Sequence, residues 1–251
     1  MTSSKRNNML AQANQDKRPN AVIELKDAWL RLRSQAGSTD ILKGIDLTIP
    51  AGQHVAIVGP SGAGKTSLLM VMSGLEALSS GRAILTGLDT TKLNEDTLAS
   101  LRRDNVGIVF QAFRLIPSMT ALQNVAVPLE LAGQADAQPK ATKALAEMGL
   151  AHRLNHLPDQ LSGGEQQRVA IARAIAPQPK ILLADEPTGN LDSAIGQQVI
   201  TQLFTAARKV QAALVLITHD EALASQCERL LRVTDGQITE DTISQPAKKM
   251  A

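Results

Sequence analysis

The sequence predicts an α/β fold in which helices cover both faces of a parallel β-sheet. Three strongly apolar segments, residues 55–58, 181–184 and 214–217, alternate with segments of helical character. Continuous apolar strands are typical of parallel sheets, because both faces of such a sheet are buried. A glycine-rich loop between the first strand and a helix is the second indication. With 251 residues, 43% of them hydrophobic, the chain can bury the core of one domain with an insert.

The remaining elements are predicted in chain order from apolar patterns and turn residues. Two strands around a polar turn (34–40) precede the glycine-rich loop, and a short helix follows it. Residues 112–160 change to helical periodicity punctuated by four prolines, which indicates a small helical insert. The predicted strands are residues 22–32, 41–49, 82–86 and 106–110, with a short strand or hairpin at 229–238. The predicted helices are residues 65–72, 120–131, 140–150 and 166–176, and one further helix is predicted before the 214–217 strand.

Both ends of the chain are polar. Residues 1–20 carry charges of both signs and lack the apolar stretch of a signal peptide, so we expect a disordered tail. Residues 241–251 are expected to form a second polar tail after a domain spanning residues 21–240. No apolar run approaches the roughly 18 residues of a membrane span, so a membrane role is expected to depend on a partner.

The overall composition narrows the function classes. The net charge of +2 gives no strong field toward nucleic acid, and 2% aromatic residues with no tyrosine disfavour base-stacking platforms. We therefore expect no nucleic-acid partner. Cys227 is the only cysteine, so a disulfide within one chain is impossible and a reducing, cytoplasmic location fits.

Residues 59–66 match the G-x-x-x-x-G-K-[ST] phosphate-binding loop. Glycines allow successive N–H groups to turn inward around phosphate oxygens, and the following helix adds its positive end. Lys65 is expected to reach the β- and γ-phosphates, and Thr66 to place its hydroxyl on Mg²⁺. A glycine-rich turn before a capped helix is the structural alternative. The predicted nucleotide-binding residues here are Gly59, Pro60, Ser61, Gly62, Ala63, Gly64, Lys65, Thr66 and Ser67.

A second glycine-containing motif lies about a hundred residues later. Ser162 and Glu165 have the spacing of a capping box at the start of a helix. Gly163 and Gly164 weaken a first helical turn, so we expect these backbone N–H groups and the Ser162 hydroxyl to face phosphate. One subunit cannot easily bring this segment to the γ-phosphate held by Lys65. The simplest arrangement is two chains, head to tail, each serving the other's nucleotide.

Polar side chains at three predicted strand ends complete the candidate site. Asp185 is expected to hold Mg²⁺ and Glu186 to act as base for the attacking water. His219 is expected to contact the γ-phosphate or that water. Gln111 could complete the Mg²⁺ shell or orient water. The structural alternatives are a solvated carboxylate turn, a surface histidine and a loop glutamine; the ligand crevice at the carboxyl ends of parallel strands favours the functional interpretation.

These motifs, in this order, resemble the nucleotide-binding subunit of an ABC transporter over residues 22–238. The resemblance assigns the Walker A loop to 59–66, the Q-loop to Gln111, the signature to 161–165, Walker B to 181–185, the D-loop to 189–192 and the switch histidine to His219. It implies a P-loop (RecA-like) fold with an antiparallel β subdomain and an inserted helical subdomain. Residues 113–117 and 185–192 resemble the branch of lipoprotein-release, macrolide-export and cell-division ATPases.

The resemblance also implies cofactors, partners and location. It implies ATP hydrolysis with Mg²⁺ held near Thr66, Gln111 and Asp185, and a homodimer enclosing two ATP. Two membrane permease subunits are expected to dock on the helical insert, at the cytoplasmic face of the inner membrane. The family usually stacks an aromatic residue on adenine where Leu32 stands. Trp29 should face the other side of that strand, so only apolar contact with the base is expected.

Two further functional classes carry similar motifs. DNA-repair and chromosome-maintenance ATPases share these motifs but insert long heptad coils between them, whereas fewer than a hundred residues intervene here. Translation-factor ATPases carry two cassettes, and this chain has room for one.

A dense apolar cluster follows Gln111, and two interpretations of it remain open. The cluster is either the permease-docking surface or the insert's own small core. Its members are Phe113, Leu115, Ile116, Pro117 and Met119.

Overall fold

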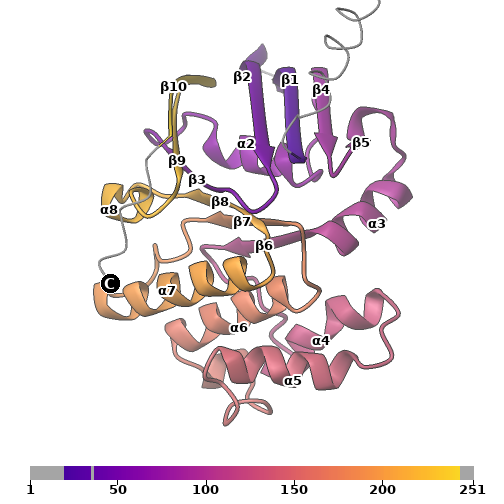
Figure 1. Ribbon diagram of the computed structural model, residues 1–251, viewed down its shortest axis with the longest axis vertical. Helices are drawn as coiled ribbons and strands as arrows, with labels where there is room; N and C mark the ends of the chain where they lie inside the picture. Colours follow the sequence, from indigo (N-terminus) through magenta and orange to yellow (C-terminus); the bar gives the residue numbers. More distant parts are fainter. Residues whose placement is uncertain (1–19, 35–36, 244–251) are drawn as a thin grey trace, which may run out of the picture.

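The computed structural model of the chain describes residues 20–34 and 37–243 (Figure 1). Apart from Asn20, the predicted N-terminal tail lies outside the described residues, as do residues 244–251. The last strand, β10, runs to Ile243, so residues 241–243 belong to a strand and not to a tail.

The predicted parallel core is confirmed as a six-stranded sheet with the order β10-β9-β3-β8-β7-β6. All neighbouring pairs are parallel except β10 with β9, which form the predicted hairpin. The strands are β3 (His54–Val58), β6 (Val106–Phe110), β7 (Ile181–Asp185), β8 (Ala213–Ile217), β9 (Arg229–Thr234) and β10 (Gln237–Ile243).

Alternate residues of the central strands belong to two separate cores. On β3, Val55 and Ile57 pack into one apolar cluster, while Ala56 and Val58 pack into the other. The same alternation runs through β7 and β8. Because successive strand side chains point to opposite faces, a strand covered on both sides must be apolar throughout. The covering helices include α2 (Lys65–Met72) on one face and α6 (Gly163–Ile175) and α7 (Ser193–Lys209) on the other.

A second, antiparallel sheet with the order β2-β1-β4-β5 lies above α2 in Figure 1. The hairpin of β1 and β2 extends further into the predicted turn than expected, with Leu32 opposite Thr39 and a 2.5 Å ion pair between Arg31 and Asp40. The strands are β1 (Ala21–Ser34), β2 (Gly37–Pro50), β4 (Ser80–Leu85) and β5 (Leu88–Asp89).

The predicted helical insert contains α4 (Ala121–Leu131) and α5 (Ala137–Glu147), which pack with α6 at the lower end of Figure 1. Thr120 caps α4 through a capping box with Gln123. The helix predicted at 140–150 begins three residues earlier, since Pro139 is tolerated in a first turn, and ends before Gly149, which has a φ of 72°.

Helix α3 (Glu95–Asn105) was not predicted. Leu101 is its only buried residue, so the sequence lacks the apolar stripe on which helix prediction relies. Its signals are electrostatic and local. Asn94 caps its N-terminus by accepting from the N–H of Thr97, acidic residues fill the first turn and arginines the last.

Candidate nucleotide-binding site

The phosphate loop joins β3 to α2, as predicted. Gly59, Gly62 and Gly64 have φ angles of 151°, 78° and 96°, which other residues rarely adopt. At Gly59 a side chain is excluded for a second reason, because a Cβ atom there would lie 2.0 Å from the carbonyl oxygen of Val233. Gly64 is the N-cap of α2 and offers no side-chain cap, so the helix N-terminus is left to bind an anion.

Lys65 lies inside the curve of this loop and is only 9% exposed. Its Nζ donates to the carbonyl oxygens of Gly59 and Pro60, each at 2.8 Å. An ammonium has three protons to donate, so one remains for a phosphate oxygen. The loop therefore fixes a positive charge beside its own inward-facing backbone.

Thr66 and Asp185 form the candidate metal site. The Thr66 hydroxyl donates to Oδ2 of Asp185 at 3.1 Å. Burial raises the pKa of Asp185, a shift that this hydrogen bond and nearby Lys65 oppose. Gln111, directly after β6, lines the same cavity. A hydroxyl, a carboxylate and an amide oxygen are the ligand types that Mg²⁺ prefers, so these residues fit the ion.

Glu186 and His219 face each other at the rim. His219 Nδ1 lies 3.5 Å from Glu186 Oε1, with the histidine side chain 72% exposed and the glutamate 28% exposed. Glu186 has a φ of 44°, a left-handed conformation that costs free energy in a residue other than glycine. Backbone bonds hold it there: its N–H donates to Ile217 and its carbonyl accepts from Gly189.

The predicted residues converge on one cavity of about 660 Å³. Eleven of them line it, together with Ile41 and Ile217, which the sequence analysis missed. Ile217 could have been predicted, because it ends β8, the strand that His219 follows. Nothing in the sequence marks Ile41. The predicted lining residues are Gly59, Ser61, Gly62, Gly64, Lys65, Thr66, Ser67, Gln111, Asp185, Glu186 and His219.

The other predicted residues do not line this cavity. Pro60 lies within the loop and Ala63 is buried beneath it. Ser162, Gly163 and Gly164 are also absent from its walls. That the signature segment serves the nucleotide of another chain stays a prediction.

The capping box at the start of α6 is confirmed. Glu165 accepts from the backbone N–H of Ser162 at 2.9 Å, and the Ser162 hydroxyl accepts from the N–H of Glu165 at 3.3 Å. The bond from the Ser162 N–H, with help from Arg153, lowers the pKa of Glu165. Gly164 has a packing role that the sequence analysis did not foresee. A Cβ atom there would lie 2.4 Å from a methyl carbon of Ile195 on α7.

Neither candidate for adenine stacking reaches the cavity. Leu32 is 48% exposed near the tip of the β1–β2 hairpin. Trp29 donates from its indole N–H to Oδ1 of Asp27 at 2.8 Å and packs over Gly44. Ile41 on β2 lines the cavity, and a Cβ atom on Gly64 would lie 2.9 Å from its backbone carbonyl oxygen.

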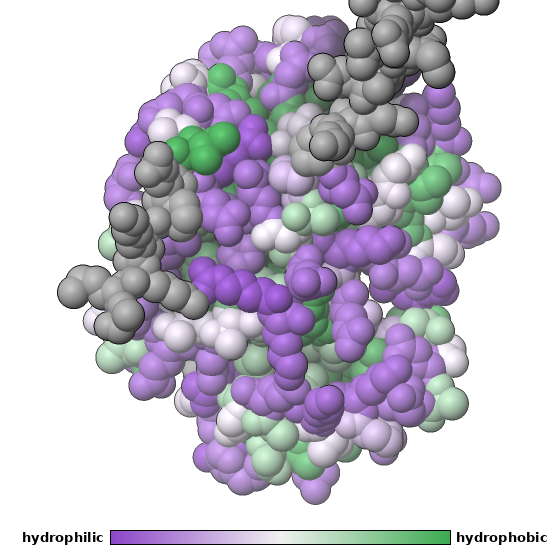
Figure 2. Space-filling model, viewed as in Figure 1, coloured by the Kyte–Doolittle hydropathy of each residue, from purple (hydrophilic) through white to green (hydrophobic). Residues whose placement is uncertain are grey.

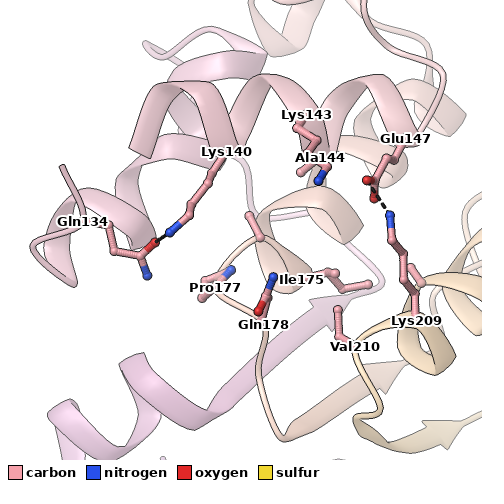
Figure 3. Close-up of a pocket in the computed structure, with 12 residues that line it drawn as sticks. Gln134, Lys140, Lys143, Ala144, Glu147, Ile175, Pro177, Gln178, Lys209 and Val210 are labelled. Carbon is pink, nitrogen blue, oxygen red and sulfur yellow. Dashed lines mark hydrogen bonds and ion pairs between the residues drawn. The ribbon is translucent and has the colours of Figure 1, made fainter. Parts of the chain in front are cut away.

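A second cavity, of about 250 Å³, lies between α5 and the C-terminal ends of α6 and α7 (Figure 3). Two of the lysines that line this cavity have polar partners. Lys140 donates to Gln134 at 2.8 Å, and Lys209 pairs with Glu147 at 2.5 Å, which ties the insert to the core. None of the predicted site residues lines this cavity, so we interpret it as the seam between insert and core.

The outer surface is mainly hydrophilic on the face seen in Figure 2, with apolar side chains in small separate patches. Among residues 20–34 and 37–243, no helix has the length and apolar character needed to cross a membrane.

Known proteins resemble this chain over most of its length. A family model described as ABC transporter matches residues 42–189. The lipoprotein-releasing system ATP-binding protein LolD of Geobacter metallireducens is 46% identical over 223 residues, covering 88% of this chain and 99% of the relative. The uncharacterized ABC transporter ATP-binding protein YbbA of Escherichia coli K12 is 47% identical over 80% of this chain and 89% of the relative. The macrolide export ATP-binding/permease protein MacB of Marinobacter nauticus is 44% identical over 89% of this chain and 35% of the relative.

A solved structure is similar throughout its length. The dimeric post-hydrolysis structure of the ATP-binding cassette MJ0796, bound to ADP and Pi, superposes with a TM-score of 0.82 at 35% identity, covering 90% of this chain and all of that one. No comparison supports the alternative of a DNA-repair or chromosome-maintenance head. The chain belongs to the ABC transporter family, in which it is an ATP-binding subunit that hydrolyses ATP.

Proposed function

We propose that two copies of this chain enclose two Mg²⁺–ATP and drive a pair of membrane permease subunits. One observation carries the proposal: Lys65, Glu186 and His219 share a cavity that Ser162 of the same chain does not reach. A partner's Ser162 and its helix N-terminus would then complete each site from the other side. The dimeric form of MJ0796, with which this fold superposes, supports such an assembly.

The residues around the cavity have separate roles in hydrolysis. Thr66 and Asp185 would hold Mg²⁺, with Gln111 beside them, and the bound ion would supply charge neutralisation at the β- and γ-phosphates. Lys65 holds the same phosphates with its remaining proton. Glu186 accepts the proton of the attacking water, and His219, 3.5 Å away, orients that carboxylate toward the γ-phosphate.

The helical insert is the proposed docking surface for the permease subunits, at the cytoplasmic face of the inner membrane. The apolar cluster defined above (113, 115, 116, 117 and 119) has no fully buried member, and Ile116 is 38% exposed. Only Leu115 packs partly against the main core, which argues against a separate core of the insert. The cluster begins two residues after Gln111, so one loop would connect the permease-docking surface to the nucleotide site.

The cargo class is proposed from the printed functions of the relatives. LolD is named for lipoprotein release and MacB for macrolide export. We propose export or extraction of a lipid-linked or amphiphilic molecule, or mechanical signalling across the envelope, with direction and cargo set by the permease subunits.

The test uses Glu186→Gln. The amide cannot accept a proton, so turnover should fall by roughly 10²-fold or more while ATP still binds. Trapped ATP should hold two subunits together, giving a dimer in Mg²⁺–ATP and a monomer without it by size exclusion with light scattering. Lys65→Ala is the control, since it should remain monomeric in both conditions. Wild-type turnover by Glu186→Gln would remove Glu186 from the base role.

A further inference from the structure

The loop after Gln111 has an unusual backbone. Phe113 and Arg114 have φ angles of 56° and 50°, two successive left-handed residues without a glycine. Such conformations persist only where surrounding contacts enforce them. This loop therefore needs partners, and it connects the γ-phosphate side of the cavity to the helical insert.

Arg173 on α6 supplies the main contacts. Its Nη1 donates to the carbonyl oxygen of Arg114 at 2.6 Å, and its Nη2 donates to the carbonyl oxygen of Phe113 at 2.9 Å. Among the described residues it has no carboxylate partner, and burial lowers its pKa. A planar guanidinium can hold two neighbouring carbonyls at once, which an ammonium cannot do with the same geometry.

Three further contacts fix the same stretch of backbone. The amide of Gln167, which is fully buried on α6, lies 3.5 Å from the carbonyl oxygen of Phe110. Asn190 donates to the carbonyl oxygen of Gln111 at 3.0 Å. The Arg114 guanidinium lies 4.5 Å over the centre of the Phe110 ring. Helix α6 and the segment after Glu186 thus hold the backbone on both sides of Gln111.

The same helix carries Ser162 at its N-terminus. Arg173 lies eleven positions after Ser162, roughly 17 Å along a straight helix. A shift of the loop would therefore move the helix as one body, and a shift of Ser162 would pull on the loop. Ser162 does not line the nucleotide cavity of its own chain.

We propose that Arg173 is a positioning residue that couples Gln111 at one ATP site to Ser162 at the other, within one dimer. The inference rests on the proposed two-ATP dimer. It assigns to α6 the transmission of nucleotide state between sites. Without the two bonds from Arg173, each site would bind ATP but respond less to its neighbour.

The experiment compares Arg173→Lys with wild type in steady-state hydrolysis over a range of ATP concentrations. We expect cooperative hydrolysis in the wild type, and in the variant a Hill coefficient near 1 with kcat reduced roughly tenfold and ATP affinity changed by less than about threefold. Arg102→Lys is the matched control. Arg102 also donates to a backbone carbonyl, that of Gly74 at 2.9 Å, but far from this loop. Lys209→Met controls for loosening the insert seam.

A second variant separates coupling from folding. Arg114→Gly relieves the left-handed cost at 114, so adding it to Arg173→Lys should restore thermal stability. If stability returns while the Hill coefficient stays near 1, Arg173 couples the sites. If cooperativity also returns, or Arg173→Lys keeps it, the inference is wrong. A wild type with no hydrolysis and no ATP-dependent dimer would instead contradict the proposed function itself.

Discussion

The Thr66 hydroxyl donates to Oδ2 of Asp185 across 3.1 Å, although 119 residues separate the two in the chain. The sheet brings them together. Thr66 lies at the start of the helix after β3, and Asp185 ends β7, with β8 between these two strands. Because parallel strands place their carboxyl ends at one edge, a loop residue and a distant carboxylate meet without any local signal in the sequence.

Asp185→Asn should stabilise the protein in the absence of nucleotide at neutral pH. Burial raises the folded-state pKa of Asp185, so its contribution to stability is present below the unfolded pKa and lost as pH rises through the folded pKa. The asparagine of the variant does not titrate, so the variant does not lose this stability as pH rises. Melting temperature should rise by a few degrees at most, because the carboxylate is partly exposed.

The measurement is thermal melting at pH 8 and at acidic pH, with and without Mg²⁺–ATP. The difference between Asp185→Asn and wild type should shrink in acid, where the wild-type carboxyl is protonated. Mg²⁺–ATP should stabilise the wild type far more than the variant. A variant that melts lower than wild type at pH 8 without nucleotide would contradict the burial argument.

Lys65 and Ser162 should complement each other across subunits. A mixed dimer of Lys65→Ala and Ser162→Asp chains has one site with both defects and one with neither. Aspartate keeps the N-cap of α6 but repels phosphate, so folding should be preserved. Hydrolysis by mixed dimers, measured over a range of mixing ratios, should exceed that of either variant alone. A fully active monomer would exclude the shared site.

Most of the fold could be predicted because its signals are local. Residues 55–58 and 214–217 are apolar on both faces, and they became β3 and β8 nearly to the residue. Helix α3 had no such signal, since it buries only Leu101 and is marked by its cap and end charges.

Some residues of the candidate site could likewise be predicted from the sequence, and others could not. The phosphate loop could be predicted because each glycine has a backbone reason, such as the 2.0 Å approach of Val233 at Gly59. The sequence predicts a phosphate role for Gly164, whereas in the structure a side chain at this position would collide with Ile195, a residue 31 positions later. Arg173 could not have been assigned from sequence, because its partners are backbone carbonyls, and carbonyls carry no sequence signature.

Discrimination between ATP and GTP should be poor. Stacking on an aromatic ring contributes on the order of 1–3 kcal/mol per base in other nucleic-acid sites, and neither Leu32 nor Trp29 lines the cavity. We expect GTP affinity within roughly tenfold of ATP affinity, an estimate that follows from losing one such contact. Competition with a fluorescent nucleotide would measure both.

Substitutions at the two positions separate the possibilities. Leu32→Tyr should tighten ATP binding, because a tyrosine side chain extends further from the hairpin than leucine, which does not line the cavity. Trp29→Phe should leave affinity unchanged, because the indole is held by Asp27 and packs over Gly44. A strong preference for ATP in the wild type, lost in Trp29→Phe, would instead make Trp29 the base-stacking residue.

Acidic substitutions in the apolar cluster after Gln111 should release the protein from its membrane partner. Phe113→Asp suits the left-handed backbone there, which aspartate tolerates better than phenylalanine, so the loop should keep its shape. Ile116→Asp places a charge on a side chain that is already 38% exposed. Both variants should fold and bind ATP, and co-sedimentation with membranes containing the permease should fall at least tenfold.

Ile243→Asp is the matched control for these docking variants. Ile243 is 72% exposed on β10, at the opposite edge of the sheet from β6, the strand that leads into the insert, so a charge there should leave membrane binding intact. Unfolding of Phe113→Asp and Ile116→Asp would identify the cluster as the insert's core, since charges are tolerated at exposed positions and costly at buried ones. Membrane binding with permease-stimulated hydrolysis at wild-type levels would place the docking surface elsewhere on the insert.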